Sequence, residues 1–161
     1  MSNLLPTRPR HLGAKRHFAI VASQYNPKFV QGLVDHCCKE IYANIANAGI
    51  ALHQVPGAFE IPLLVQEIAR VGGVDGIIAL GVIIEGETGH AGHIAAAVTD
   101  ALMKISLEFR IPIIHEVLSV RNEEQAAKRC LEDAINRGTE AARVAVHFAT
   151  IMSEFREKTA V

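Results

Sequence analysis

The chain has 161 residues and a mass of 17.4 kDa, which is enough for one domain with a full hydrophobic core and too little for two. Half of the residues are hydrophobic and only 20% are charged, so we expect part of the surface to be covered in a homo-oligomer. The net charge of -1, with acids and bases interspersed, gives no basic stripe and argues against nucleic acid as a partner.

The N-terminal part of the chain predicts an arm, a strand and a helix. Residues 1–15 contain two prolines and are expected to form an irregular arm. From Arg16, the run HFAIVAS predicts a short buried strand, because β-branched and aromatic residues favour strands. Asn26 and Pro27 match an N-cap and a first helical residue, and apolar residues at helical spacing extend this helix to Gly49.

The middle of the chain predicts two more strands around a second helix. Residues 50–55 form the expected second strand, which the Pro-Gly pair at 56–57 ends. Glu60 lies at the predicted start of the second helix, which runs to the glycines at 72–73. The unbroken apolar run over about 76–84 predicts a third strand that is buried on both faces.

The C-terminal half predicts one strand and three helices. A helix is expected from Thr88, as its N-cap, to Phe109, and the run IIHEVLSV that follows predicts a fourth strand. Asn122 is the predicted N-cap of a fourth helix through Ile135. Gly138 is expected to end that helix, and a fifth helix then begins at Thr139.

Strand and helix alternate four times without a hairpin signal, which predicts an α/β fold. We expect a flavodoxin-like, doubly wound, four-stranded parallel sheet with helices on both faces, in a single domain over residues 1–161. Ligands of such sheets bind outside the carboxyl ends of the strands. Three polar clusters fall there, at residues 25–26, 56–60 and 85–93.

The cysteines and the apolar runs indicate in which cellular compartment the protein is expected. The three cysteines are odd in number and two are adjacent, which suits reduced thiols, packed in the core, better than disulfides. Residues 1–15 lack the hydrophobic segment of a secretion signal, and no apolar run approaches the roughly 18–20 residues of a membrane span. We therefore expect a cytoplasmic protein without a membrane partner.

The run EGETGHAGH over residues 85–93 is the main candidate for a ligand-binding loop. Its glycine spacing matches neither a dinucleotide fingerprint nor a P-loop, so a plain turn is the alternative. His90 and His93, with His115, are one candidate metal set, although no cysteine lies nearby. His90 is the better candidate for proton transfer, because an imidazole both donates and accepts protons near neutral pH.

Three further residues each have a structural and a functional interpretation. Tyr25 either closes over the end of its strand or stacks on a flat heterocycle. Glu60 is either a favourable acid at a helix start or an acceptor for ligand hydroxyl and amide groups. Arg129, judged from its surroundings in the sequence, is a solvated residue paired with Glu132 or Glu124.

Three motifs together resemble the dimethyl-ribityllumazine synthase family of riboflavin biosynthesis. They are VPGAFEIP at 55–62, ALGVIIEGETGH at 79–90 and RNEEQAAKRCLEDAINRGTEAA at 121–142. The resemblance implies an enzyme that joins an amino-ribitylamino-pyrimidinedione to dihydroxybutanone phosphate without a metal or organic cofactor. It also implies pentamers, or multiples of pentamers, with active sites between adjacent subunits.

The resemblance also implies three groups of site residues. The family positions that hold the pyrimidine and the ribityl chain match Tyr25, Asn26, Ala58, Phe59, Glu60, Val82, Ile83, Ile84 and His115. Those that bind phosphate match Glu87, Thr88, Arg129 and Arg137, and the proton-transfer histidine matches His90. The neighbouring subunit contributes the positions of His115 and Arg129.

The chain departs from the family pattern inside the implied pocket. Glu85 stands where the family usually has arginine, and Ala91 and Gly92 replace an aromatic residue and an acid. His115 replaces a common phenylalanine, and residues 131–133 replace a Gly-Thr-Lys segment. These departures motivate two alternatives: a non-catalytic relative that binds flavin or lumazine or serves in assembly, and an enzyme that condenses a different amine and carbonyl.

Overall fold

A computed structural model describes residues 5–8 and 15–159, and its centre is one four-stranded parallel sheet. The strands are β1 (His17–Ser23), β2 (Gly49–Val55), β3 (Gly76–Ile84) and β4 (Ile113–Val120), in the order β2-β1-β3-β4. All three pairings are parallel, so every strand delivers its carboxyl end to the same edge of the sheet. The predicted α/β fold is confirmed.

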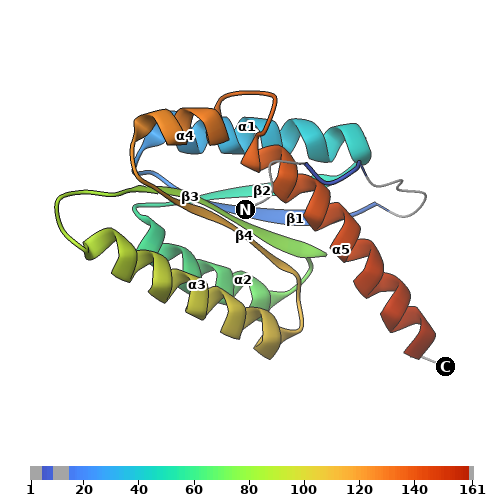
Figure 1. Cartoon of the computed structure of the whole chain (residues 1–161). Helices are drawn as coiled ribbons and strands as arrows, with labels where there is room; N and C mark the ends of the chain where they lie inside the picture. Colours follow the sequence, from blue (N-terminus) through green and yellow to red (C-terminus); the bar gives the residue numbers. More distant parts are fainter. Residues whose placement is uncertain (1–4, 9–14, 160–161) are drawn as a thin grey trace.

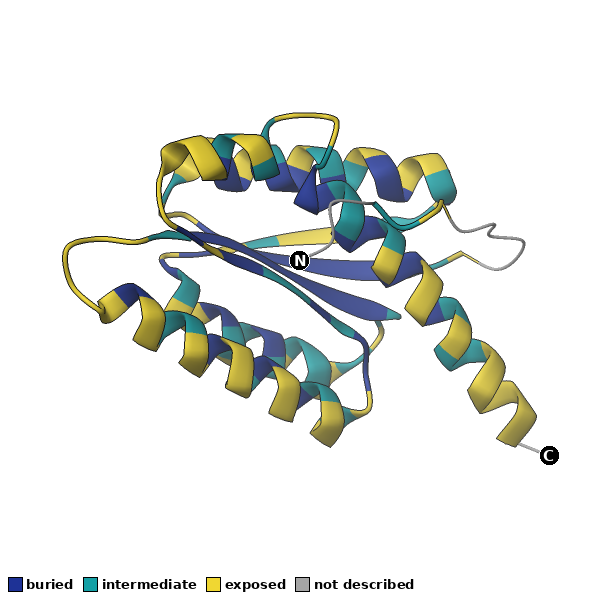
Figure 2. Ribbon diagram, in the orientation of Figure 1, coloured by how far each residue is buried: buried dark blue, intermediate teal, exposed yellow. Residues whose placement is uncertain are grey.

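Helices cover both faces of the sheet (Figure 1). α1 (Pro27–Asn44), α4 (Glu123–Cys130) and α5 (Arg137–Thr159) lie on one face, while α2 (Ile61–Val71) and α3 (His90–Phe109) lie on the other. A short 3-10 helix, η1 (Ala58–Glu60), leads into α2. Each helix layer packs its own apolar cluster against the sheet, and the central strands β1 and β3 are buried on both faces (Figure 2). None of the helices in the described ranges is long and apolar enough to cross a membrane.

Two predicted helix boundaries are wrong. α1 ends at Asn44 rather than Gly49, because the Asn44 amide donates to the Glu40 carbonyl at 2.6 Å and the chain turns extended at Ile45. α3 begins at His90, after Gly89, and Thr88 is not its N-cap. Glycine is costly inside a helix, so the segment before His90 remains a loop.

The predicted boundary between the last two helices is also wrong. α4 ends at Cys130 instead of continuing to Ile135, and α5 begins at Arg137, so Gly138 lies inside the first turn of a helix that it was expected to precede. Buried Asn136 starts α5: its side-chain oxygen accepts from the backbone N–H of Gly138 at 2.9 Å and of Thr139 at 3.3 Å. The prediction of Asn122 as the N-cap of α4 is confirmed by its 2.9 Å bond from the Gln125 N–H.

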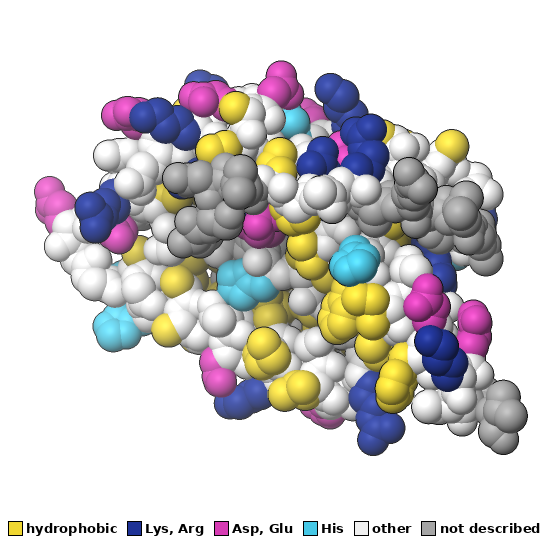
Figure 3. Space-filling view, turned by 45° about the vertical axis from the view of Figure 1, so that its right-hand side comes forward, with side chains coloured by type: hydrophobic (Ala, Val, Ile, Leu, Met, Phe, Trp, Pro, Cys, Tyr) yellow, Lys and Arg dark blue, Asp and Glu magenta, His cyan; other side chains and the backbone are white. Residues whose placement is uncertain are grey.

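One exposed stripe of α5 is apolar. It carries large hydrophobic side chains that water reaches, and apolar side chains gather on this side of the molecule (Figure 3). These residues are Val144, Phe148, Ile151 and Phe155. Contiguous exposed apolar surface of this kind marks an interaction site, in agreement with the oligomer expected from the composition.

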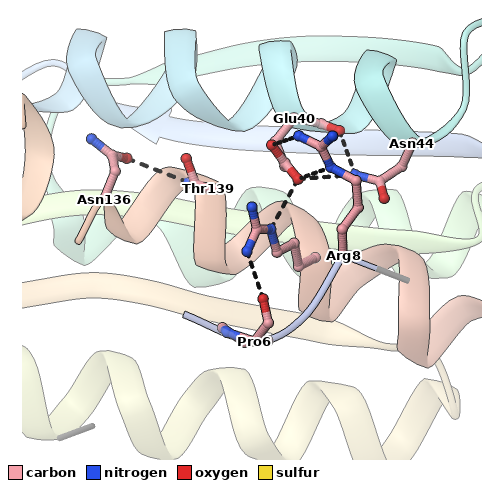
Figure 4. Close-up of polar contacts among 7 residues, drawn as sticks. Pro6, Arg8, Glu40, Asn44, Asn136 and Thr139 are labelled. Carbon is pink, nitrogen blue, oxygen red and sulfur yellow. Dashed lines mark hydrogen bonds and ion pairs between the residues drawn. The ribbon is translucent and has the colours of Figure 1, made fainter. Parts of the chain in front are cut away.

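A buried carboxylate joins the N-terminal arm to two helices (Figure 4). Glu40 of α1 accepts two hydrogen bonds from Arg8, at 2.9 and 3.0 Å, and one from Arg143 of α5 at 2.9 Å. Arg143 also donates to the Pro6 carbonyl at 2.6 Å. The Arg8 side chain, and also Arg143, holds the pKa of Glu40 down at about 2 against the opposing effect of burial.

We expect Glu40→Gln to lower the free energy of unfolding by about 2 kcal/mol at pH 7, because it removes charge-assisted bonds from a buried group. The folded pKa of Glu40 is depressed, so its stabilisation is complete above the ordinary value of 4.5 and is lost as the pH falls towards 2. Urea unfolding at fixed protomer concentration should show the wild-type advantage shrinking over that range. Glu67→Gln, which breaks an exposed pair with Arg70, is the matched control and should change stability by less than about 1 kcal/mol. A pH-independent loss for Glu40→Gln would contradict this account.

Candidate active site

The carboxyl ends of β1 and β3, the helix η1 and the start of α3 enclose a cavity of about 520 Å³. Its lining contains ten of the fourteen residues that the sequence predicted for the site, together with Gly57, Gly86, Ala91 and Ile94. The ten are Tyr25, Asn26, Ala58, Phe59, Glu60, Val82, Ile83, Ile84, Thr88 and His90. Segments that are about 30 residues apart in the chain therefore converge on one hollow at the edge predicted for ligands.

Tyr25 forms one wall of the cavity. Its backbone N–H donates to the Pro56 carbonyl at 3.2 Å, which ties the end of β1 to the turn that precedes η1. A Cβ on Gly57 would lie 3.2 Å from two carbons of the Tyr25 ring, so the ring rests against the glycine backbone. Tyr25 is 70% exposed, which leaves its aromatic surface available for stacking on a flat ring.

Asn26 is held in an unusual backbone conformation beside Tyr25. It has φ 57° and ψ 53°, in the left-handed region that asparagine tolerates better than most residues. It precedes α1 as predicted, but its side chain does not cap the helix and instead donates from Nδ2 to the Val82 carbonyl at 2.8 Å. That bond ties β3 to the start of α1 and leaves Oδ1 as an acceptor for a ligand N–H.

Glu60 is oriented by its own turn. One carboxylate oxygen, Oε2, accepts the backbone N–H of Gly57 at 2.8 Å. The carboxylate has a second oxygen with its own lone pairs, so Glu60 also has the capacity to accept hydrogen bonds from hydroxyl or N–H groups in the cavity. The helix-start interpretation made from the sequence is confirmed by this bond, and the same side chain also lines the cavity.

The loop after β3 closes the cavity on the side of α3. Thr88 and His90 are exposed and line the cavity, whereas Glu87 is exposed and is not among its lining residues. Buried Ala91 and half-buried Ile94 supply the apolar surface behind His90. A side chain at Gly86 would meet no other atom within 4 Å, so this glycine leaves open space at the cavity.

A second cavity, also of about 510 Å³, lies at the end of β4 and beside α4. It contains Arg129 and Arg137, two of the predicted phosphate ligands, together with Lys128 and Glu132. Arg137 is 2% exposed and ion-paired with Glu140, whereas Arg129 is half-buried and forms no ion pair within the described part of the chain. Glu124 pairs instead with Lys128 at 2.9 Å, so the pairing of Arg129 with Glu132 or Glu124 expected from the sequence is wrong.

His115 lies away from the first cavity, on β4 facing α3. The backbone N–H of Val117 donates to its Nδ1 at 3.2 Å, which requires the proton of the neutral ring to lie on Nε2. Nε2 is 2.8 Å from the hydroxyl of Thr99, which itself donates to the Ala95 carbonyl. Burial lowers the pKa of His115, in agreement with a neutral ring in this chain of hydrogen bonds. Within one protomer, His115, Arg129 and Arg137 are thus separate from the cavity.

The residues that sequence reasoning missed have weak sequence signals. Lys128 lies one position before Arg129 in a helix and resembles any solvated lysine until the fold places it at a cavity. The sequence indicates Gly57 only as part of a turn, although its missing side chain makes room for both the Tyr25 ring and the Glu60 carboxylate. In the described part of the chain, no group of three or more His, Cys, Asp and Glu side chains is arranged to hold a metal ion.

Comparison with known proteins assigns the chain to a family. The profile of the 6,7-dimethyl-8-ribityllumazine synthase family matches residues 15–153. The chain belongs to this family. The 6,7-dimethyl-8-ribityllumazine synthase of Burkholderia multivorans is 38% identical over 145 residues, which are 89% of this chain and 82% of that protein. The synthase of Pediococcus pentosaceus is 37% identical over 131 residues, which are 81% of this chain and 84% of that protein. The family match extends over every strand of the sheet and over both cavities.

Proposed function

We propose that this protein is a transferase that condenses 5-amino-6-(D-ribitylamino)uracil with 3,4-dihydroxy-2-butanone 4-phosphate to give 6,7-dimethyl-8-ribityllumazine. The observation that carries the proposal is the first cavity, which gathers an aromatic ring, an amide, a carboxylate and an imidazole at one sheet edge. Family membership supplies the reaction class, and the cavity supplies the chemical groups that such substrates require.

Each group in the cavity suits one part of the pyrimidine substrate. Tyr25 stacks on the flat ring, while the free Oδ1 of Asn26 accepts from a ring N–H. The Glu60 carboxylate oxygen that is not bonded to the Gly57 N–H accepts hydrogen bonds from hydroxyl groups of the ribityl chain. The backbone of Val82 to Ile84 lines the remaining wall.

The reaction needs positioning and modest proton transfer more than a strong nucleophile. The substrate amine attacks the ketone to form an imine, phosphate is eliminated, and the ring closes. His90 is the imidazole that gives and takes protons beside the reacting atoms. Thr88 lies beside it at the loop that faces the phosphate.

We infer that a neighbouring subunit completes the site. Arg129 and Arg137 lie at a different cavity of their own protomer. Among the described residues, the lining of the first cavity includes no lysine or arginine to bind phosphate. A homopentamer, or a multiple of it, brings the arginine-bearing cavity of one protomer to the first cavity of the next, where a guanidinium binds phosphate as a fork. The exposed apolar side chains of α5, and those of Met103 and Leu107 on α3, provide surface for such contacts.

A second candidate function rests on Glu85 and on the absence of side-chain functional groups at Ala91 and Gly92. Acids in the loop after β3 repel a phosphate dianion, by several kcal/mol where they are desolvated. The alternative is therefore a family member that binds lumazine or flavin without turnover. Both Glu85 and Glu87 are exposed, so water screens this repulsion, and we favour the enzyme.

Purified protein mixed with both substrates is expected to form product faster than the spontaneous reaction. The measurement is the near-ultraviolet absorbance and fluorescence of the lumazine over time, with a protein-free sample as control. Product at the spontaneous rate in the presence of the protein would overturn the proposed enzyme. If such an inactive protein bound the lumazine tightly, the non-catalytic alternative would be favoured.

A further inference from the structure

A further hollow, distinct from the second cavity, adjoins the first cavity and is lined by another imidazole. It has a volume of about 520 Å³ and is lined by Phe59, Glu60, His90, His93, Ile94 and Ala97. Four of these six residues also line the first cavity, so the two hollows adjoin one another. The extension adds His93 and Ala97 to the lining, and of these two only the His93 imidazole has atoms that can donate or accept a proton.

The geometry of α3 places His93 next to His90. The two residues are three positions apart in the first helical turn, which places them on the same face of the helix. A Cβ on Gly89 would lie 4.0 Å from Nε2 of His93, so the ring lies back over the start of the helix.

We propose that His93 is a second proton-transfer group of this site and works together with His90. The inference rests on the proposed function. The titratable groups that share the hollow with His93 are His90 on the same helix and Glu60 from η1. Glu60 is partly committed to the Gly57 N–H, so the pair of imidazoles is the part of the hollow that is suited to exchange protons.

The proposed reaction has work for two such groups. When the amine attacks the ketone, its nitrogen loses one proton and the former carbonyl oxygen gains one. Dehydration to the imine removes the second nitrogen proton and adds a second proton to that oxygen, which leaves as water. Elimination then removes a carbon-bound proton while the electron pair of the C–O bond leaves with phosphate. An acid and a base are required at the same time during dehydration, and two imidazoles in different protonation states supply them.

The test is steady-state kinetics of His93→Gln across pH, with His147→Gln as the matched control. His147 is an exposed histidine of α5 that lines neither hollow. We expect His93→Gln to lower kcat about 10- to 100-fold, to change the KM of each substrate less than about threefold, and to shift the acid side of the kcat profile. Added imidazole should restore part of the lost rate, and His147→Gln should match the wild type.

The outcomes separate the inference from the proposed function. Unchanged kcat and an unchanged pH profile in His93→Gln, with an active wild type, would overturn the role of His93 alone. A loss that appears only in KM, without rescue by imidazole, would also overturn it, because that is the result of lost packing or binding. A wild type without product would overturn the proposed function and the role of His93 with it.

Discussion

Mixing the two impaired variants His90→Gln and Arg129→Ala is expected to give activity well above that of either variant alone. Each site in the proposed ring takes His90 from one protomer and Arg129 from its neighbour. In a random mixture of equal amounts, about a quarter of the sites receive both intact residues. We therefore expect about a quarter of the wild-type rate after the two proteins are unfolded and refolded together.

The parent variants are expected to fail for different reasons. His90→Gln should lower kcat about 100-fold, because a positioned acid or base contributes that much or more. Arg129→Ala should raise the KM of the phosphorylated substrate roughly 10- to 100-fold, since it removes charge-assisted hydrogen bonds to phosphate. Both assays are run at substrate concentrations that saturate neither parent, and light scattering checks that both keep the wild-type oligomer size.

A matched mixture distinguishes a shared site from simple stabilisation. His90 and Glu60 line the same cavity of one protomer, so no site in a mixture of His90→Gln with Glu60→Ala contains both intact residues. That mixture should remain at the level of its parents. Restoration in both mixtures, or in neither, would contradict a site shared between His90 of one subunit and Arg129 of the next.

Replacement of Glu116 by Gln is expected to stabilise the protein at alkaline pH. Glu116 is a carboxyl group of β4, where burial, followed by the charge of Glu140, raises its pKa to about 8 against the opposing effect of Arg137. A folded pKa above the ordinary value of 4.5 means that folding holds a proton that the unfolded chain releases. The resulting cost is absent below about pH 4.5, grows up to about pH 8 and is constant above it.

Glu116→Gln removes this cost because glutamine does not ionise. We expect a gain of about 2–4 kcal/mol in the free energy of unfolding at pH 9 and little change near pH 4.5. Urea unfolding of both proteins at one protomer concentration measures the difference. Glu154→Gln, an exposed acid on α5, should stay within about 0.5 kcal/mol at either pH. An equal gain at both pH values would mean that packing, rather than ionisation, is responsible.

The sequence predicted the sheet well because its signals are local. β3 is apolar over its whole length and β1 from Phe18 to Ala22, and such runs mark strands that are covered on both faces. The predicted cluster at the strand ends follows from the parallel topology alone, since the carboxyl ends share one edge. Ten candidate residues therefore lie in one cavity although they come from three separate segments.

The predicted boundary at Gly138 failed because this glycine answers to a contact far along the chain and does not mark a helix end. Gly138 resembles a helix stop, but it lies inside α5, where the close approach of the Leu33 backbone in α1 leaves no room for a side chain. The signal for the true start was Asn136, an ordinary N-cap residue, which a sequence with several candidate caps does not single out. Asn26 was recognised as the residue before α1, but its bond to Val82 depends on the position of β3.

The second imidazole and the second cavity were missed for a related reason. His93 was considered only with His90 and His115 as a metal set, and the fold directs His115 to Thr99 instead. Arg129 has one interpretation as a surface residue and another through the family resemblance. One protomer places it beside Lys128 and away from the first cavity, so the phosphate-binding role proposed for it requires a neighbouring subunit.

Two glycines limit which changes are possible around α4, the helix that carries Lys128 and Arg129. A side chain at Gly32 of α1 would lie 2.5 Å from the carbonyl oxygen of Cys130, and one at Gly138 would meet the carbonyl of Leu33. The backbone at both ends of the segment between α4 and α5 thus packs directly against the backbone of α1. In a saturation-mutagenesis library, positions 32 and 138 should tolerate no other amino acid. Lys128 and Arg129 lie outside this contact and should accept replacements without loss of folding. Directed evolution towards a differently charged second substrate is therefore best aimed at side chains of α4, with the path of the backbone left unchanged.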